Sequence, residues 1–177
     1  MTAKSYTFRQ LVDFLCVIGQ VAPESKSTFV SRLMQLQRLG FPDGVNVGHG
    51  VRMKYSIVEI YKLALAFEIL ATGLPPRVTL SAIRENWDVI CGCIETFFDQ
   101  AGSDNFDSLL EIVILMMPNC SDFTVCSGLI MQIVDFSNLA DVLSNSSEIS
   151  GRSGFVVIRL HNLLRRIEKY SDKHLSI

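Results

Sequence analysis

Residues 27–60 limit the possible fold of this chain more than any other segment. Their pattern predicts a helix, a Gly-rich ribbon and the start of another helix. Ser27 or Thr28 can cap a helix that runs to about Leu39 and ends at the Gly-Phe-Pro sequence that follows. Residues 43–55 alternate glycine with apolar side chains, which predicts a two-stranded hairpin. A helix with a basic outer face can enter the major groove of DNA while a basic hairpin reaches the flanking backbone. The stretch therefore predicts a nucleic-acid-binding surface.

Amphipathic helices are predicted on both sides of this stretch. Residues 7–18 place apolar side chains at helical spacing. Ser56 and Glu59 form the pattern of a capping box at the start of a helix that ends near Ala71. A longer helix is expected from about Val78 to Phe98.

The second half of the chain is less regular. Residues 106–117 are strongly apolar and fit either a helix or a buried strand. The other expected elements are a mainly helical segment at 125–143, a loop at 144–154, a strand at 155–160 and a basic amphipathic helix at 162–170.

The predicted fold class is mainly α, with two domains. Residues 5–100 are expected to form a winged helix-turn-helix domain with a small β-hairpin wing. Residues 104–177 are expected to form a C-terminal α or α+β domain that serves dimerisation, an effector or a partner protein. A chain of 177 residues with 49% apolar residues is long and apolar enough for such cores.

Charge is distributed unevenly along the chain. The net charge is −2, so no global positive field draws the protein to nucleic acid. Residues 1–90 nevertheless hold ten Lys and Arg against seven Asp and Glu, whereas residues 91–177 hold six against eleven. This asymmetry indicates a first half that faces an anion and a second half with a different role.

The candidate contact residues are polar or basic side chains of the helix and the hairpin. Arg and Gln can read guanine and adenine edges, and Ser and Thr can bind phosphate or a base. An ordinary solvated helix has a similar face, but the basic hairpin that follows favours DNA. His49, at the ribbon tip, can contact a minor-groove edge or a phosphate, or can be a surface residue without a role. The predicted DNA-binding residues are Lys26, Thr28, Ser31, Arg32, Gln35, Arg38, His49, Arg52, Lys54 and Tyr55.

Three motifs carry a family resemblance over residues 7–85. Gln37-Arg38-Leu39-Gly40-Phe41 is similar to the motif ERIGL, and residues 50–56 (GVRMKYS) are similar to GYRxYS. Residues 60–73 are similar to a helix that ends in LRELG. In these motifs and in the order of its elements, the chain resembles the winged helix-turn-helix domain of MerR-type transcription regulators.

The resemblance implies roles for several of these residues. Arg38 and Arg52 would hold the DNA backbone, and Tyr55 would brace the wing. The helix expected at 78–98 would correspond to the family's dimerisation helix. Gln35 stands in the place of an aromatic residue of the family's recognition helix, so the resemblance implies no base preference.

The cysteines admit a second kind of function. The number of cysteines is odd, five, and reduced thiols in a cytoplasmic protein are the simplest interpretation. Cys120 and Cys126 can also respond to a thiol reagent or a metal in a sensing switch. The spacing of Cys91 and Cys93 does not suit a zinc clamp, so no metal is expected.

The remaining hypotheses concern partners. No phosphate loop, dinucleotide fingerprint or nucleophile elbow is present in the sequence, and we expect neither an enzyme nor a cofactor. No apolar run approaches the roughly 20 residues that span a bilayer, so we expect no membrane contact. The expected partner is double-stranded DNA, bound by a homodimer that pairs through its C-terminal half. A further expected partner is a protein such as the transcription machinery. The alternative is a protein–protein interaction module that keeps the winged fold without reading DNA.

Overall fold

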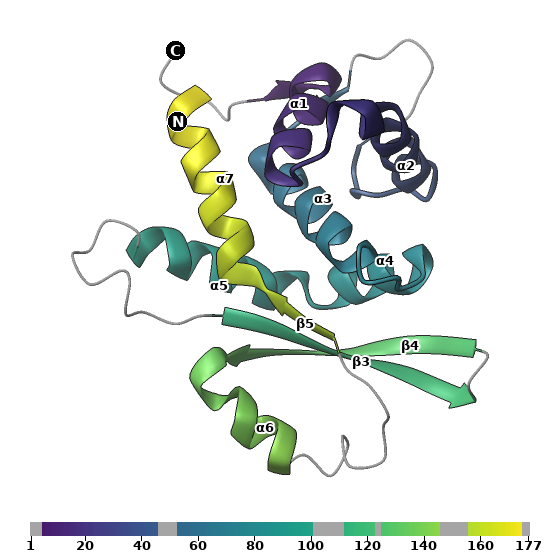
Figure 1. The fold of residues 1–177 in the computed structure, drawn as a ribbon, viewed down its shortest axis with the longest axis vertical. Coiled ribbons are helices and arrows are strands. Elements are labelled where there is room, and N and C mark those ends of the chain that lie inside the picture. Colours follow the sequence, from purple (N-terminus) through teal and green to yellow (C-terminus); the bar gives the residue numbers. More distant parts are fainter. Residues whose placement is uncertain (1–4, 46–52, 101–111, 123–124, 146–155, 175–177) are drawn as a thin grey trace. The chain divides into compact units, whose positions relative to one another are not determined.

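The computed structural model describes residues 5–45, 53–100, 112–122, 125–145 and 156–174 (Figure 1). The chain divides into two compact units. The first unit holds residues 1–71 and 166–177, and the second holds residues 72–165. The sequence suggested a division between residues 100 and 104, whereas the structure divides the chain after Ala71 and assigns the end of the chain to the first unit.

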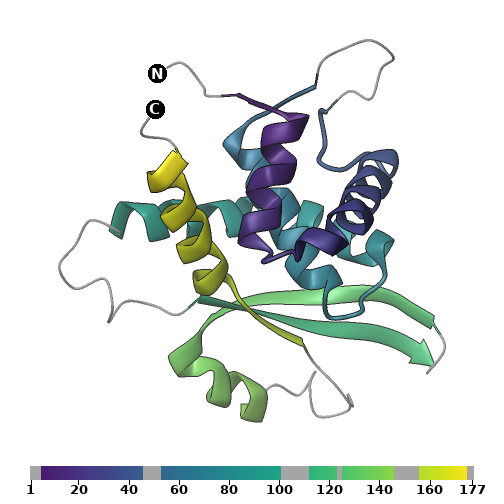
Figure 2. The same ribbon diagram turned by 45° about the horizontal axis from the view of Figure 1, so that its top comes forward.

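The first unit is mainly helical. Its elements are β1 (Tyr6–Thr7), α1 (Phe8–Ile18), the 3-10 helix η1 (Pro23–Ser25), α2 (Lys26–Arg38), β2 (Lys54–Tyr55), α3 (Ile57–Leu70) and the end of α7 (Leu160–His174). The helices predicted at the positions of α1, α2 and α3 are confirmed. The cap predicted at Ser27 or Thr28 is wrong, because α2 begins at Lys26 and both residues lie within its first turn. Helix α1 packs against both α2 and α3, as both ribbon views show (Figure 2).

Local capping defines where α1 and α3 begin. The Thr7 hydroxyl accepts a hydrogen bond from the Gln10 amide at 3.3 Å, and the Gln10 side-chain oxygen accepts one from the Thr7 amide at 2.9 Å. Ser56 and Glu59 form the predicted capping box of α3. Each box satisfies amides that the first turn of a helix leaves without partners.

The end of α2 is fixed by Gly40, which has a φ of 73°. The amide of Phe41 donates to the carbonyl of Leu36 at 3.0 Å, and the amide of Gly40 donates to the carbonyl of Gln37 at 2.9 Å. This is a Schellman motif, in which a left-handed glycine closes the helix. Phe41 is only 1% exposed, so the turn is anchored in the core.

The predicted hairpin is only partly within the described residues. Its tip lies outside them, and its second arm is β2, which pairs antiparallel with β1 through Tyr6–Tyr55 and Thr7–Lys54. The described residues 43–45 form no strand. The small sheet therefore joins the start of the chain to the residues before α3.

The second unit combines helices with a three-stranded antiparallel sheet. Its elements are α4 (Pro76–Glu85), α5 (Trp87–Gln100), β3 (Ile112–Asp122), β4 (Val125–Asp135), η3 (Phe136–Asn138), α6 (Leu139–Asn145), β5 (Val156–Arg159) and the start of α7. The strand order is β4-β3-β5. Helices α4 and α5 lie on one side of this sheet and α6 on the other (Figures 1 and 2). The strand expected at 155–160 and the helix expected at 162–170 are confirmed as β5 and α7.

Two predictions for this unit are wrong. The single helix expected at 78–98 is two helices, because Asn86 leaves helical geometry and its side-chain amide donates to the carbonyl of Ala82 at 2.8 Å. The segment expected to be helical from residue 125 begins instead with β4, whose register pairs Leu115 with Gln132. Pairing with β3 outweighs the helical pattern of this segment, because strand preference depends on the neighbouring strand. The apolar segment that fitted either structure is, where described, strand β3.

Candidate nucleic-acid interface

The outer face of α2 carries five of the predicted contact residues. We call Thr28, Ser31, Arg32, Gln35 and Arg38 the outer strip; all five are exposed. Successive residues of an α-helix turn by about 100°, so positions three apart differ by only about 60°. Arg32, Gln35 and Arg38 therefore lie side by side around one face, with Arg32 at its edge. The opposite face buries Phe29, Leu33 and Leu36.

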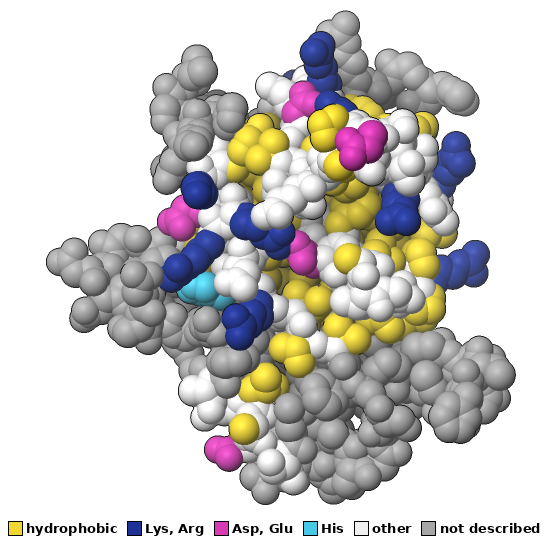
Figure 3. Space-filling view, in the orientation of Figure 1, with side chains coloured by type: hydrophobic (Ala, Val, Ile, Leu, Met, Phe, Trp, Pro, Cys, Tyr) yellow, Lys and Arg dark blue, Asp and Glu magenta, His cyan; other side chains and the backbone are white. Residues whose placement is uncertain are grey.

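The outer strip is rich in hydrogen-bond donors and free of acidic groups. Helix α2 contains three basic residues and no Asp or Glu. Dark blue Lys and Arg side chains lie over α2 on the right of the space-filling view (Figure 3). The Ser31 hydroxyl donates to the carbonyl of Ser27 at 3.0 Å, and its oxygen can still accept a hydrogen bond. These groups can bind phosphate oxygens or base edges.

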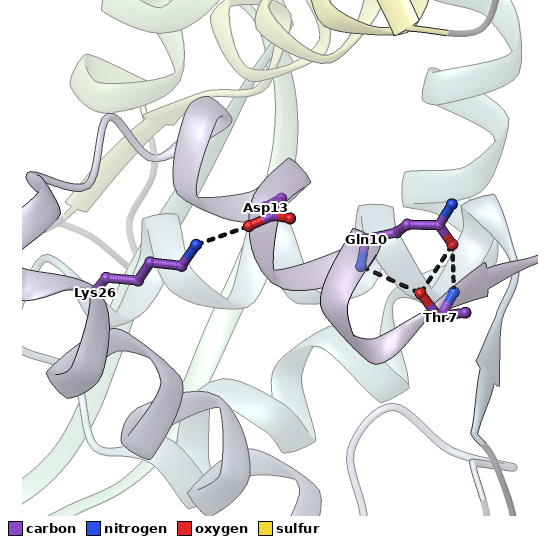
Figure 4. A network of polar contacts seen from close by, with 4 residues as sticks. All are labelled: Thr7, Gln10, Asp13 and Lys26. Carbon is purple, nitrogen blue, oxygen red and sulfur yellow. Dashed lines mark hydrogen bonds and ion pairs between the residues drawn. The ribbon is translucent and has the colours of Figure 1, made fainter. Parts of the chain in front are cut away.

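Lys26 belongs to α2 but not to the outer strip. Its ammonium donates to the Asp13 carboxylate of α1 at 2.7 Å, and the pair is exposed to solvent (Figure 4). This hydrogen bond is the main cause of the raised pKa of Lys26, and the negative charge of Asp13 adds to it. The Lys26 side chain is thus turned toward α1 and paired with Asp13, and its role as a DNA contact stays a prediction.

Tyr55 is not on the surface at all. Its side chain is 0% exposed, so it cannot touch a partner, and its prediction as a contact residue is wrong. Its hydroxyl accepts a hydrogen bond from the Gln37 amide at 2.5 Å and donates to the Met53 sulfur at 3.0 Å. Burial raises the pKa of Tyr55, and the hydrogen bond from Gln37 lowers it in part. Tyr55 instead connects β2 to the end of α2.

Gln37 is the structural residue that the sequence interpretation missed. It is buried on α2 and supplies the hydrogen bond to Tyr55. The sequence contained a signal for this buried role, because Gln37 follows Leu33 by four residues and therefore falls on the apolar stripe of the helix. A polar side chain on such a stripe usually has a buried partner.

Three other predicted contact residues belong to the predicted ribbon at residues 43–55. Lys54 is exposed on this strand, next to the buried Tyr55. His49 and Arg52 lie outside the described residues. Lys54 is therefore the exposed basic residue of β2, and its role as a DNA contact stays a prediction.

The cysteines form no metal centre in the described part of the chain. No group of three or more His, Cys, Asp or Glu side chains suited to a metal occurs there. Cys91 and Cys93 are not in disulfides, and burial raises the pKa of the Cys93 thiol. In the backbone register of β3 and β4, Cys120 lies opposite Cys126. Within the same described residues, no helix has the length and apolar character that a bilayer crossing requires.

Comparison with known proteins assigns the chain to no family. It matches no protein-family model, and no curated protein matches its sequence. The chemistry of the outer strip is therefore the guide to function. Exposed guanidinium, amide and hydroxyl groups without a neighbouring acid on the same helix suit a partner rich in acceptor oxygens.

Proposed function

We propose that this chain is a sequence-specific DNA-binding regulator that lays α2 in the major groove. The observation that carries the proposal is the outer strip, which is exposed and contains donors but no acid. A major groove about 12 Å wide admits one α-helix. The succession of α1, α2, a short sheet and α3 supports a winged helix-turn-helix arrangement like that of MerR-type regulators.

The positions along α2 suggest how the contacts are shared. Gln35 lies between the two arginines of the outer strip, where its amide can pair with an adenine edge. Arg32 and Arg38 flank it and suit phosphates or guanine edges. Lys54 is exposed on β2 and suits a flanking phosphate. Gln37 and Tyr55 stabilise the interface from within, because their hydrogen bond fixes α2 relative to β2.

A homodimer completes the proposal. One copy offers few cationic contacts, and its affinity at physiological salt would be low. Two copies double the phosphate contacts and match a near-palindromic site. Strand β4 is eleven residues long and forms one edge of the described three-stranded sheet, so it is the strand we expect to pair with a second copy.

Binding to random-sequence duplex DNA across a salt series tests the proposal. We expect the logarithm of the association constant to fall linearly with the logarithm of salt concentration, by about 0.9 for each neutralised phosphate. Arg38→Ala is expected to lower affinity and to reduce this slope by about 1. Arg32→Ala is expected to act in the same direction.

Arg77→Ala is the matched control, because Arg77 is an exposed arginine of α4 in the second unit. It removes the same charge from the chain without altering the outer strip. Equal losses of DNA affinity in Arg38→Ala and Arg77→Ala would mean that net charge alone drives binding. Absence of binding at the lowest salt concentration would contradict the proposal.

One observation favours a second candidate, a protein-interaction module. Met34 lies on α2 beside the outer strip and is 44% exposed, so an apolar side chain is accessible to a protein partner there. Met is well suited to adaptable protein contacts. If the partner is a protein, Met34→Gln weakens the complex more than Arg38→Gln does, and the affinity depends little on salt.

A further inference from the structure

A pocket of about 330 Å³ lies within the first unit, where α1, α2, α3 and the end of α7 meet. Its apolar walls include Leu15, Ile18, Phe29, Ala64 and Phe67. Hydrophobic side chains are visible between α2 and α3 in the space-filling view (Figure 3). Small-molecule sites occupy about 300–1,000 Å³, and the volume of this pocket falls at the lower end of that range.

Two aromatic rings form one wall of this pocket. Phe29 of α2 and Phe67 of α3 have ring centroids 4.5 Å apart and planes inclined by 34°. Phe29 is buried, whereas Phe67 is half-buried and keeps part of its surface open. A flat or extended apolar group can pack against these rings and remove that surface from water.

Charged groups also line the pocket. Arg166 of α7 donates to the carbonyl of Ile18 at 2.9 Å and forms an ion pair with Glu68 of α3. These contacts hold the Arg166 guanidinium in place and balance the charge of Glu68. The pair therefore leaves no net charge on its side of the pocket.

Arg32 supplies the charge that is not balanced. It lines the same pocket from α2, is exposed, and forms no hydrogen bond or ion pair with any residue that the structure describes. The charged lining consists of two arginines and one glutamate, a net charge of +1. A guanidinium beside an apolar pocket is the usual partner of a carboxylate, which it binds through two parallel hydrogen bonds.

We propose that this pocket binds a small apolar monocarboxylate. The apolar body packs against Phe29 and Phe67, and the carboxylate pairs with Arg32. A neutral apolar molecule leaves Arg32 without a partner, and a second carboxylate exceeds the charge of +1 that the lining offers. All residues that line the pocket belong to the first unit, and the proposal does not depend on DNA binding by the chain.

Calorimetric titration of the full chain with matched acids and amides tests the proposal. The probes are octanoate, phenylpropionate and indoleacetate, each beside its neutral amide. We expect at least one acid to bind saturably and about tenfold or more tighter than its amide, because a charge-assisted hydrogen bond forms only with the acid. Arg32→Gln is expected to remove this preference and to leave the affinity for the amide unchanged.

Arg38→Gln is the control, since it removes the same charge from the same helix but does not line the pocket. It is expected to keep the preference for the acid. Both substitutions are at exposed positions, and circular dichroism checks that each variant is folded. Equal binding of acid and amide, a preference that survives Arg32→Gln, or no binding of any probe up to about 10 mM overturns the proposal.

Discussion

The Gln37 side-chain amide donates a hydrogen bond of 2.5 Å to the Tyr55 hydroxyl, and both side chains are buried. The bond joins the last turn of α2 to β2, which is separated from α2 by residues 39–53 of the sequence. A buried polar pair of this kind fixes geometry, because either group without its partner is costly. The orientation of the outer strip relative to Lys54 therefore depends on it.

Removing one partner of this bond is expected to destabilise the first unit. Tyr55→Phe leaves the buried Gln37 amide without an acceptor and should cost about 1–3 kcal/mol of unfolding free energy. The double variant Gln37→Leu with Tyr55→Phe removes both polar groups and should recover part of this loss. Urea denaturation followed by circular dichroism measures both values. Additive losses in the double variant would show that the two side chains are not coupled.

Asp13→Asn is expected to strengthen DNA binding. The substitution releases Lys26 from its ion pair and removes a negative charge beside α2. Because the pair is exposed, the thermal midpoint should change little. Asp88→Asn makes the same change in net charge on α5 of the second unit and is the control. A salt series should show that Asp13→Asn raises DNA affinity more than Asp88→Asn does. Equal gains in affinity would rule out a local effect of Lys26.

Gly40→Ala is expected to destabilise the end of α2. Gly40 has a φ of 73°, and a Cβ in this conformation costs about 1 kcal/mol. Gly92→Ala should have the opposite sign, because Gly92 lies within α5 and a Cβ there meets nothing within 4 Å. Alanine within a helix is more favourable than glycine by about 0.5–1 kcal/mol. Urea midpoints of the two variants should move in opposite directions from the wild type.

Stability is expected to fall as the pH rises from about 10 to about 12. Burial is the main cause that raises the pKa of Tyr61 from 10.0 to about 12, and the nearby Tyr6 and Glu168 add to it. In this interval the unfolded chain loses the phenol proton and the folded chain keeps it, so unfolding becomes more favourable. Below pH 10 both states are protonated and Tyr61 adds no pH dependence.

Tyr61→Phe tests this assignment because the ring remains and the ionisable group is lost. Titration followed by tyrosinate absorbance should lose its component near pH 12, and the fall in stability above pH 10 should become shallower. If the component that disappears titrates at the ordinary pH of tyrosine, the buried position of Tyr61 does not control its ionisation.

Glu68→Gln is expected to tighten carboxylate binding in the pocket of the first unit. It removes the one acidic group of the pocket lining and leaves two arginines. The affinity for phenylpropionate should rise several-fold while that for its amide stays the same, as calorimetry can measure. Loss of the ion pair with the part-buried Arg166 should also lower the unfolding free energy. If the folded Glu68→Gln variant binds phenylpropionate more weakly than the wild type does, the carboxylate of the ligand lies away from these arginines.

Local signals in the sequence were sufficient for the first three helices. The capping box at Ser56 and the glycine at position 40 act over a few residues, so their effect can be read directly from the sequence. The apolar stripe of α2 identified its buried face, and the exposed outer strip followed from it. These features depend only on helical periodicity.

Contacts between distant segments decided the rest. Residues 125–135 form a strand because β3 supplies its backbone partners, and β2 pairs with β1 across nearly fifty residues of sequence. Lys26 is turned to Asp13 by the packing of α2 on α1, and Arg166 reaches Glu68 from the far end of the chain. The sequence by itself therefore determined which segments of the first unit are helical and which of their sides are buried. Only the tertiary structure decided which polar groups are paired, because the free energy of a hydrogen bond or ion pair depends on a partner that periodicity does not identify.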